Sequence, residues 1–255
     1  MDEQKKNALT AEADGVIEGR NAVIEALRAG ESIDKIYILK GETDKTLGHI
    51  ASKARAAGIV VVDADRRKLD NMSRTHAHQG VIALAAVREY VNVESILEGA
   101  AAKGENPLLV ICDEISDPHN LGAIIRSAEC AGAHGVIVPE RRAAGLGPTA
   151  AKSAAGALNY MRIARVKNLN RTIDELKERG VWVIGTAMDG ENAFSADLTG
   201  SVALVIGSEG EGISRLTLEK CDHTLTLPML GQIESLNASV AAGVLMYEIV
   251  RARAK

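Results

Sequence analysis

The sequence predicts an α/β protein with a C-terminal, mostly parallel sheet covered by helices on both faces and a smaller N-terminal α/β domain. Apolar runs of strand length alternate with helical stretches along the chain, and such alternation builds parallel sheets. The C-terminal strands are almost continuously apolar, as expected when both faces of a sheet are buried. A chain of 255 residues is long enough for two domains of ordinary size.

The N-terminal part reads as a tail followed by a compact domain. Residues 1–14 are polar and charged without periodicity, which predicts a flexible tail. Residues 15–86 form the expected smaller domain, which begins with a helix at 20–29 that Gly30 ends. Its further elements are a strand at 35–39, a helix at 47–57, a strand at 59–62, a short basic segment and a strand at 81–85.

Residues 87–106 are expected to be a linker that contains a helix, because charge, glycines and the following proline interrupt the apolar pattern. Residues 107–255 form the second domain. Its strands are expected at 108–112, 135–138, 181–184, 202–206 and 224–227, and its helices at 121–131, 169–179 and 238–251.

Composition limits the possible functions. Only 2% of residues are aromatic and the formal net charge is −4, so a nucleic acid would have to be bound through local basic patches rather than on an aromatic platform. The 3 cysteines show no C-x-x-C spacing, which predicts neither a metal site nor disulfides and suits a reducing cytosol. No apolar run approaches the ~20 residues of a membrane span. We therefore expect a cytoplasmic protein with no membrane partner.

An acidic glycine loop follows the apolar run at 202–206. In it Gly207, Gly210 and Gly212 alternate with Ser208, Glu209 and Glu211. Neither the dinucleotide-binding nor the P-loop pattern is present, and the two carboxylates would repel a pyrophosphate. The loop instead suits a ligand that carries positive charge.

A second segment, 113–126, joins a strand end to a helix. Asp117 can cap this helix and Pro118 suits its first position. Asn120 and Arg126 can reach one ligand only if Asn120 projects from the helix end and Arg126 from its side. These residues could also serve only as helix-capping residues, and nothing pairs His119 with a nucleophile.

Two further segments are locally basic. Residues 66–78 hold Arg66, Arg67, Lys68 and Arg74 against Asp70, a net charge of +3 with neutral histidines. They could contact an RNA backbone or form a solvated helix face.

Residues 139–156 are rich in Ala and Gly and carry Arg141 and Arg142. This composition predicts a mobile cationic loop, either one that closes over a phosphodiester or an ordinary surface loop. The segment 227–239 leads into the last helix, for which Ser235 and Asn237 are natural cap residues.

Taken together, these segments resemble a known family. Asn120-Leu-Gly-x-x-x-Arg126, Ile206-Gly-Ser-Glu-Gly-Glu-Gly-Ile213 and Leu227-Pro-Met-x-Gly followed by Ser235-Leu-Asn-x-Ser239 are similar, in order and spacing, to the three motifs of the SpoU (TrmH-like) family of RNA 2′-O-ribose methyltransferases. Residues 17–23 and 78–82 resemble the accessory substrate-binding domain of that family. The chain is most similar to its members that methylate a guanosine in 23S ribosomal RNA.

The resemblance implies S-adenosylmethionine as methyl donor, ribosomal RNA as partner, a homodimer, and a C-terminal domain threaded into a trefoil knot. The implied catalytic residues are Arg126, Asn120, Glu209, Ser235 and Asn237. The implied cofactor-binding residues are Gly207, Leu227, Leu236, Thr186 and Pro228. Arg20, Arg66, Arg67, Arg141 and Arg142 are the expected RNA contacts. Glu209 is expected to face and hold the Arg126 guanidinium.

Three alternatives stay open at this point. The same chemistry could act on transfer RNA or on another ribosomal RNA site. The chain could be a non-catalytic RNA-binding module that keeps the fold. A nucleotide-dependent oxidoreductase is the third alternative, although the missing fingerprint and the acidic loop argue against it.

Overall fold

The computed structural model describes residues 15–41 and 44–254, so the tail expected at 1–14 lies outside the described residues. The chain divides into two compact units. The first runs to Glu89 and includes Gly145–Pro148, and the second holds Tyr90–Ala144 and Thr149–Lys255. Each unit has its own sheet.

The first unit is a four-stranded mixed sheet in the order β1-β4-β2-β3. Strands β2 and β3 pair in parallel, and β4 runs antiparallel to β1 and β2. Helices α2 and α3 bury their apolar sides in one cluster with the sheet, and α4 buries Leu69 in another. The elements are β1 (Val16–Glu18), α2 (Arg20–Ala29), β2 (Ile33–Leu39), α3 (Lys45–Ala56), β3 (Val60–Ala64), α4 (Arg66–Met72) and β4 (Val81–Ala85).

Local signals in the sequence explain where these helices begin and end. The Asp44 carboxylate accepts hydrogen bonds from the backbone N–H groups of Thr46 and Leu47 at the start of α3. Asp65 caps α4 in the same way through the backbone N–H of Lys68. Gly30 ends α2 in the left-handed conformation that glycine adopts without strain.

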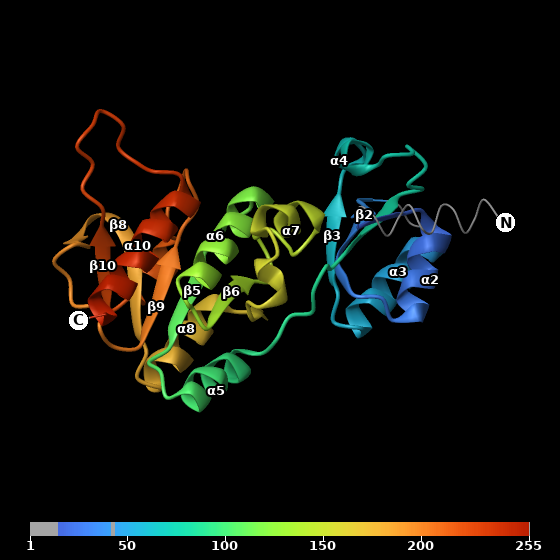
Figure 1. The fold of residues 1–255 in the computed structure, drawn as a ribbon. Coiled ribbons are helices and arrows are strands. Elements are labelled where there is room, and N and C mark those ends of the chain that lie inside the picture. Colours follow the sequence, from blue (N-terminus) through green and yellow to red (C-terminus); the bar gives the residue numbers. More distant parts are fainter. Residues whose placement is uncertain (1–14, 42–43, 255) are drawn as a thin grey trace. The chain divides into compact units, whose positions relative to one another are not determined.

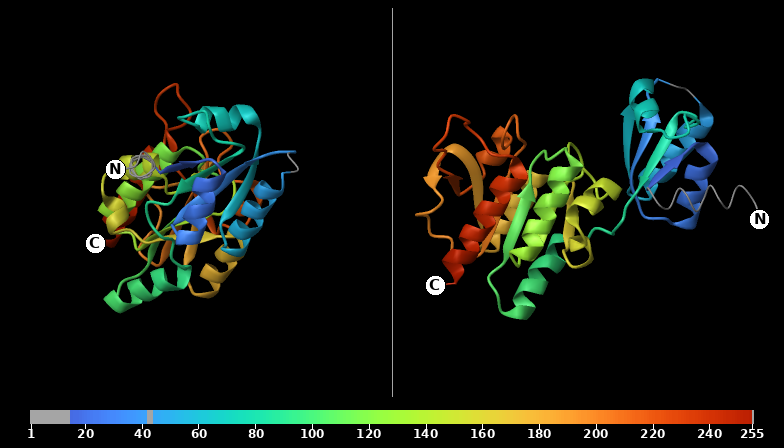
Figure 2. Two further views of the ribbon diagram at one scale, coloured as in Figure 1. Left: turned by 90° about the vertical axis from the view of Figure 1, so that its right-hand side faces the viewer. Right: turned by 45° about the horizontal axis from the view of Figure 1, so that its top comes forward.

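The second unit is a six-stranded sheet, order β10-β8-β9-β5-β6-β7, in which every pairing is parallel. Helices α6 and α10 lie side by side on one face (Figures 1 and 2), and α5 and α8 bury Ile96 and Ile173 against the other. The elements are α5 (Val93–Lys103), β5 (Leu108–Cys112), α6 (Pro118–Cys130), β6 (Gly135–Pro139), α7 (Pro148–Ala154), the 3-10 turn η1 (Ala157–Asn159), β7 (Ile163–Val166), α8 (Leu169–Glu178), β8 (Trp182–Asn192), β9 (Val202–Ile206), α9 (Arg215–Leu218), β10 (His223–Thr226) and α10 (Ala238–Arg253). The predicted α/β class is confirmed.

One local prediction needs correction, and some short elements were missed. Part of the segment 139–156, expected to be a mobile loop, is helix α7, which suits its alanine content. Gly122 of α6 packs directly against α7, since a Cβ on Gly122 would lie 2.4 Å from the carbonyl oxygen of Ala150. The short strands β1 and β7 were not predicted, because three or four residues carry too little periodicity to identify a strand.

Among the described residues, none of the helices combines the length and the apolar character that crossing a membrane requires. The knot expected from the family resemblance concerns how the chain is threaded. Strand order alone does not test it, and it stays a prediction.

Candidate active site

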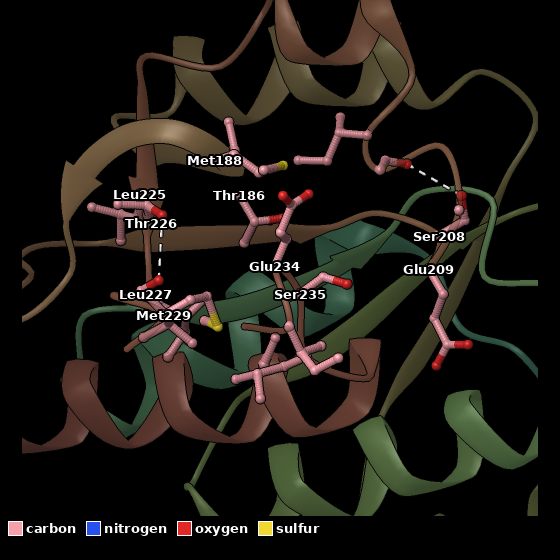
Figure 3. Close-up of a pocket in the computed structure, with 18 of the residues that line it drawn as sticks. Thr186, Met188, Ser208, Glu209, Leu225, Thr226, Leu227, Met229, Glu234 and Ser235 are labelled. Atoms are coloured by element: carbon pink, nitrogen blue, oxygen red, sulfur yellow. Dashed lines mark hydrogen bonds between the residues drawn. The ribbon is translucent and has the colours of Figure 1, made fainter. Parts of the chain in front are cut away.

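The candidate site is a cavity of about 870 Å³ within the second unit. The middle of strand β8, the loops that follow β9 and β10 and the start of α10 line it (Figure 3). Ligand sites of open parallel sheets lie at this edge, where the carboxyl ends of the strands meet.

The glycine loop, residues 207–213, is a tight hairpin rather than an open cradle. Ser208 and Gly212 exchange two backbone hydrogen bonds of 3.0 Å. A Cβ on Gly207 would lie 2.1 Å from the carbonyl carbon of Gly212, and Gly212 has φ +68°. Both positions therefore require glycine.

Three predicted catalytic residues meet at the tip of this loop. The Asn120 side chain donates a 3.0 Å hydrogen bond to the Glu209 carboxylate. The Asn237 amide donates to the same carboxylate oxygen and, at 2.9 Å, to the Asn120 carbonyl oxygen. The three side chains form a closed ring, although 117 residues separate Asn120 from Asn237.

Helix ends position two members of this ring. Asn120 lies in the first turn of α6, which Asp117 caps through the backbone N–H of His119 and which Pro118 begins. Asn237 is the cap residue of α10, where its side-chain oxygen accepts from the backbone N–H groups of Ser239 and Val240. Asn237 thus caps a helix with its oxygen and contacts Glu209 with its nitrogen.

Arg126 does not pair with Glu209, contrary to expectation. The guanidinium is exposed on α6, and within the described part of the chain it makes no hydrogen bond or ion pair. Figure 3 shows the Glu209 side chain extending away from Thr186 and toward the helices, where the two amides bind its carboxylate. Both amides donate to one oxygen of that carboxylate, Oε1.

Four of the five residues predicted to bind the cofactor line the cavity, namely Thr186, Leu227, Pro228 and Leu236. Gly207 is not one of the described residues that line the cavity, and the close approach of its backbone to Gly212 lets the hairpin close. The predicted catalytic residue Ser235 also lines the cavity.

The cavity has an acidic lining that the sequence only partly revealed. Among the described residues, its lining includes Glu209, Glu211 and Glu234 but no lysine, arginine or histidine. Glu234, which lines the cavity together with Thr186 (Figure 3), was not predicted. An acid next to the predicted Ser235 was the available signal. Apolar side chains such as Leu225 and Leu245 form the remaining wall. A ligand with an apolar ring system and a positive charge fits this lining, whereas a phosphate would be repelled.

The two cysteines nearest the sheet are poor nucleophiles. Burial, with a contribution from Asp113, raises the pKa of the Cys112 thiol to about 12. Burial and Asp222 raise the pKa of Cys221 to about 11. A thiol attacks as its thiolate, so neither side chain supplies a covalent step near neutral pH.

The predicted RNA-contacting arginines occur in both units. In the first unit Arg66 and Arg67 are exposed on α4, while Arg20 forms a 2.8 Å ion pair with Asp44. In the second unit Arg141 and Arg142 are exposed after β6, where Arg142 pairs with Glu114.

His119 has a partner that the sequence did not indicate, since its Nδ1 lies 3.1 Å from the Ser153 hydroxyl. No cluster of potential metal ligands occurs in residues 15–41 and 44–254.

Comparison with protein families agrees with this geometry. Residues 107–247 match the SpoU rRNA Methylase family, and residues 16–91 match the family model described as RNA 2′-O ribose methyltransferase substrate binding.

Two relatives align over most of their length. The chain is 46% identical over 236 residues to the TrmH family protein YacO of Bacillus subtilis, covering 92% of this chain and 94% of that protein. It is 45% identical over 238 residues to the 23S rRNA (guanosine-2′-O-)-methyltransferase RlmB of Ralstonia nicotianae, covering 92% and 94%.

Solved structures give the same relationship. The SpoU methyltransferase AviRb from Streptomyces viridochromogenes, in complex with AdoMet, superposes with a TM-score of 0.61 at 26% identity, covering 98% of this chain and 94% of that chain. The AdoMet-bound rRNA methyltransferase from Sinorhizobium meliloti superposes with a TM-score of 0.59 at 25% identity, covering 96% and 90%.

Proposed function

Because the chain belongs to the SpoU rRNA methylase family, we propose that it methylates the ribose 2′-hydroxyl of a guanosine in 23S ribosomal RNA. Membership of the family makes the chain an RNA 2′-O-ribose methyltransferase that uses S-adenosylmethionine. The ribosomal target is the finer part of the proposal, and the identity to RlmB supports it.

The observation that carries the cofactor assignment is the charge of the cavity. Three glutamates and, within the described part of the chain, no basic side chain line it, and S-adenosylmethionine combines a cationic sulfonium with a flat aromatic adenine. When bound, this cofactor supplies a methyl group that an oxygen nucleophile can accept. We assign its binding to Thr186, Leu227, Pro228 and Leu236, with Gly207 shaping the loop beside it.

The nucleophile is a poor one, because a free ribose hydroxyl is largely protonated near neutral pH. The protein must therefore align it and stabilise the developing alkoxide. An arginine side chain stays charged in proteins, so we assign Arg126 to electrostatic stabilisation and to gripping the adjacent phosphate. The ring of Asn120, Glu209 and Asn237, together with Ser235, positions the substrate.

RNA recognition is assigned to exposed arginines of both units. The first unit matches a substrate-binding family model, and Arg20, Arg66 and Arg67 belong to it. Arg141 and Arg142 belong to the second unit, close in sequence to the catalytic segment. An RNA substrate held through local patches is compatible with the net charge of −4, and a ribosomal target implies a cytoplasmic location.

The proposal includes a homodimer, and an apolar stripe on α10 supports it. Val240, Val244 and Tyr247 recur at helical spacing and are 50%, 37% and 51% exposed. An exposed stripe of this kind on a terminal helix is a typical subunit contact.

Transfer RNA is a second candidate target, because YacO belongs to a family of tRNA/rRNA methyltransferases. Mapping 2′-O-methylated nucleotides in 23S ribosomal RNA and transfer RNA from a strain lacking the gene separates the two targets. Loss of one guanosine methylation in 23S ribosomal RNA is expected. Loss of a transfer RNA methylation alone would overturn the ribosomal assignment.

The catalytic assignment is tested with Arg126→Ala. We expect methyl transfer to fall at least about 100-fold, the size typical of removing a group that stabilises developing charge. Calorimetry should still detect S-adenosylmethionine binding. Arg28→Ala is the control, because Arg28 is an exposed arginine of the first unit paired with Glu25. Wild-type turnover by Arg126→Ala would contradict the assignment, and a wild-type protein without affinity for S-adenosylmethionine would favour a non-catalytic RNA-binding module.

A further inference from the structure

One residue outside the cavity holds both ends of the glycine loop. The backbone N–H of Asp113 donates a 2.8 Å hydrogen bond to the carbonyl of Ile206, the residue before the loop. The Asp113 carboxylate accepts a 2.8 Å hydrogen bond from the backbone N–H of Ser214, the residue after the loop. Asp113 therefore anchors both ends of the hairpin, although 101 residues separate it from Ser214 in the sequence.

The position of Asp113 excludes direct contact with a ligand in the cavity. Asp113 is only 5% exposed, and it is not among the residues that line the cavity. Burying a carboxylate is costly unless hydrogen bonds compensate it. Asp113 directly follows β5, and its carboxylate binds the backbone N–H of Ser214, the residue after the loop. Asp113 is thus placed to act on the loop rather than on the ligand.

The loop has three levels of attachment, and Asp113 provides the lowest. The hydrogen bonds between Ser208 and Gly212 close its middle. Asn120 and Asn237 hold its tip through Glu209. The attachment at Asp113 joins the two residues that flank the hairpin to the end of β5, and it therefore helps to set where residues 208–213 lie along the cavity wall.

We propose that Asp113 is a positioning residue for cofactor binding: by holding the base of the glycine loop it presets the cavity wall and sets the affinity for S-adenosylmethionine. The inference rests on the proposed function. A wall already in place loses little conformational freedom when the ligand binds, whereas a loose hairpin must be ordered at the expense of affinity. Because Asn120 and Asn237 hold the tip separately, loosening the base should weaken binding more than the chemical step.

The test compares variants of the full-length protein. Asp113→Ala removes the acceptor, whereas Asp113→Asn keeps an oxygen that can accept from Ser214. Ser214→Pro removes the donor from the other side, since its φ of −58° suits proline. Ser214→Ala is the matched variant that keeps the backbone N–H. Calorimetry gives the Kd for S-adenosylmethionine, methyl transfer gives kcat and KM, and thermal unfolding gives Tm.

We expect Asp113→Ala and Ser214→Pro each to raise Kd and KM for S-adenosylmethionine roughly 10-fold or more, the size expected when a hydrogen bond to a carboxylate is lost. The kcat at saturating cofactor should change much less. Asp113→Asn should recover most of the affinity, and Ser214→Ala should bind more tightly than Ser214→Pro. In the double variant the two effects should not multiply, since both break the same bond.

Asp222→Ala is the control for general loss of stability. Its carboxylate also accepts a backbone hydrogen bond, 2.9 Å from the N–H of Val183 at the start of β8. We expect a lower Tm with unchanged cofactor affinity.

Three results would overturn the inference: an Asp113→Ala Kd within twofold of wild type, an Asp113→Asn protein as weak as Asp113→Ala, or multiplying effects in the double variant. If Asp113→Ala does not fold, the two Ser214 variants decide, because Ser214 is only half-buried. A wild-type protein that does not bind S-adenosylmethionine refutes the proposed function instead, so the two failures are distinguishable.

Discussion

Residues 207–213 and residues 228–236 wall the same cavity, but only the first loop is held by hydrogen bonds at its base, middle and tip. The second loop is exposed along its length, with Leu230 97% and Ile233 77% exposed. Within the described part of the chain it makes no hydrogen bond or ion pair. We infer that the first loop is ready for a ligand, whereas the second must become ordered around it at an entropic cost.

The largest expected effect comes from disturbing the tight loop. Gly207→Ala places a Cβ 2.1 Å from the carbonyl carbon of Gly212 and 2.2 Å from the nitrogen of Ile213, so the hairpin must rebuild. We expect affinity for S-adenosylmethionine to fall by about 100-fold, as measured by calorimetry.

Gly231→Ala is the matched change in the exposed loop. No atom lies within 4 Å of its added Cβ, so its effect on affinity should be at least about tenfold smaller. If Gly207→Ala and Gly231→Ala lost affinity for S-adenosylmethionine equally, the contrast between the hydrogen-bonded loop and the exposed loop would be refuted.

The tip of the tight loop gives the next effect. Glu209→Ala removes the acceptor shared by Asn120 and Asn237. Asn120 is buried, and leaving a buried polar group unpaired costs about 1–3 kcal/mol. If its position in the site is lost with that bond, kcat should fall roughly 10- to 100-fold.

Glu211→Ala removes a carboxylate from the same cavity without breaking a side-chain hydrogen bond, because only the backbone N–H of Glu211 is bonded, to Ser208. Its kcat should therefore be much closer to wild type. If the two variants lost activity equally, charge in the cavity rather than the hydrogen-bonded ring would be the important property.

The smallest effect concerns the exposed loop. Thermolysin should cleave first on the N-terminal side of Leu230 or Ile233, because exposed segments without hydrogen bonds open most easily. Saturating S-adenosylmethionine should slow this cleavage about tenfold, with mass spectrometry identifying the sites. Cleavage within 207–213 at a similar rate would show that the first loop is as loose as the second.

Much of the fold could be predicted because its signals are local. The apolar runs that became β5 and β9 fall at the predicted residues, and Gly30 ends α2 as expected. Helix α7 was mistaken for a loop because alanine and glycine content alone does not separate the two states. What decides its place is packing of its backbone against Gly122, a contact between segments that are separate in the sequence.

The candidate site, like the fold, could be predicted only in part from the sequence. The motifs identified the family, and family membership is confirmed. The assigned site roles, the domain boundaries and the knot stay predictions. The pairing expected for Glu209 is not the one in the structure, because a carboxylate accepts hydrogen bonds from amides as well as from a guanidinium and the sequence does not say which donor lies within reach. The fold brings the amides of Asn120 and Asn237 to it.

The sequence by itself determined the α/β class, the family and the positive charge of the ligand that an acidic glycine loop admits. The class and the ligand charge follow from periodicity and from residues a few positions apart, whereas the family follows from the resemblance of three motifs to those of known proteins. Only the tertiary structure decided that Asp113 holds the base of that loop, that Asn120 and Asn237 hold its tip, and that Glu234 joins the cavity lining. These hydrogen-bond partners lie 89 or 101 residues apart in the sequence. They meet because the parallel strands end together at one edge of the sheet, and no local sequence pattern encodes that meeting.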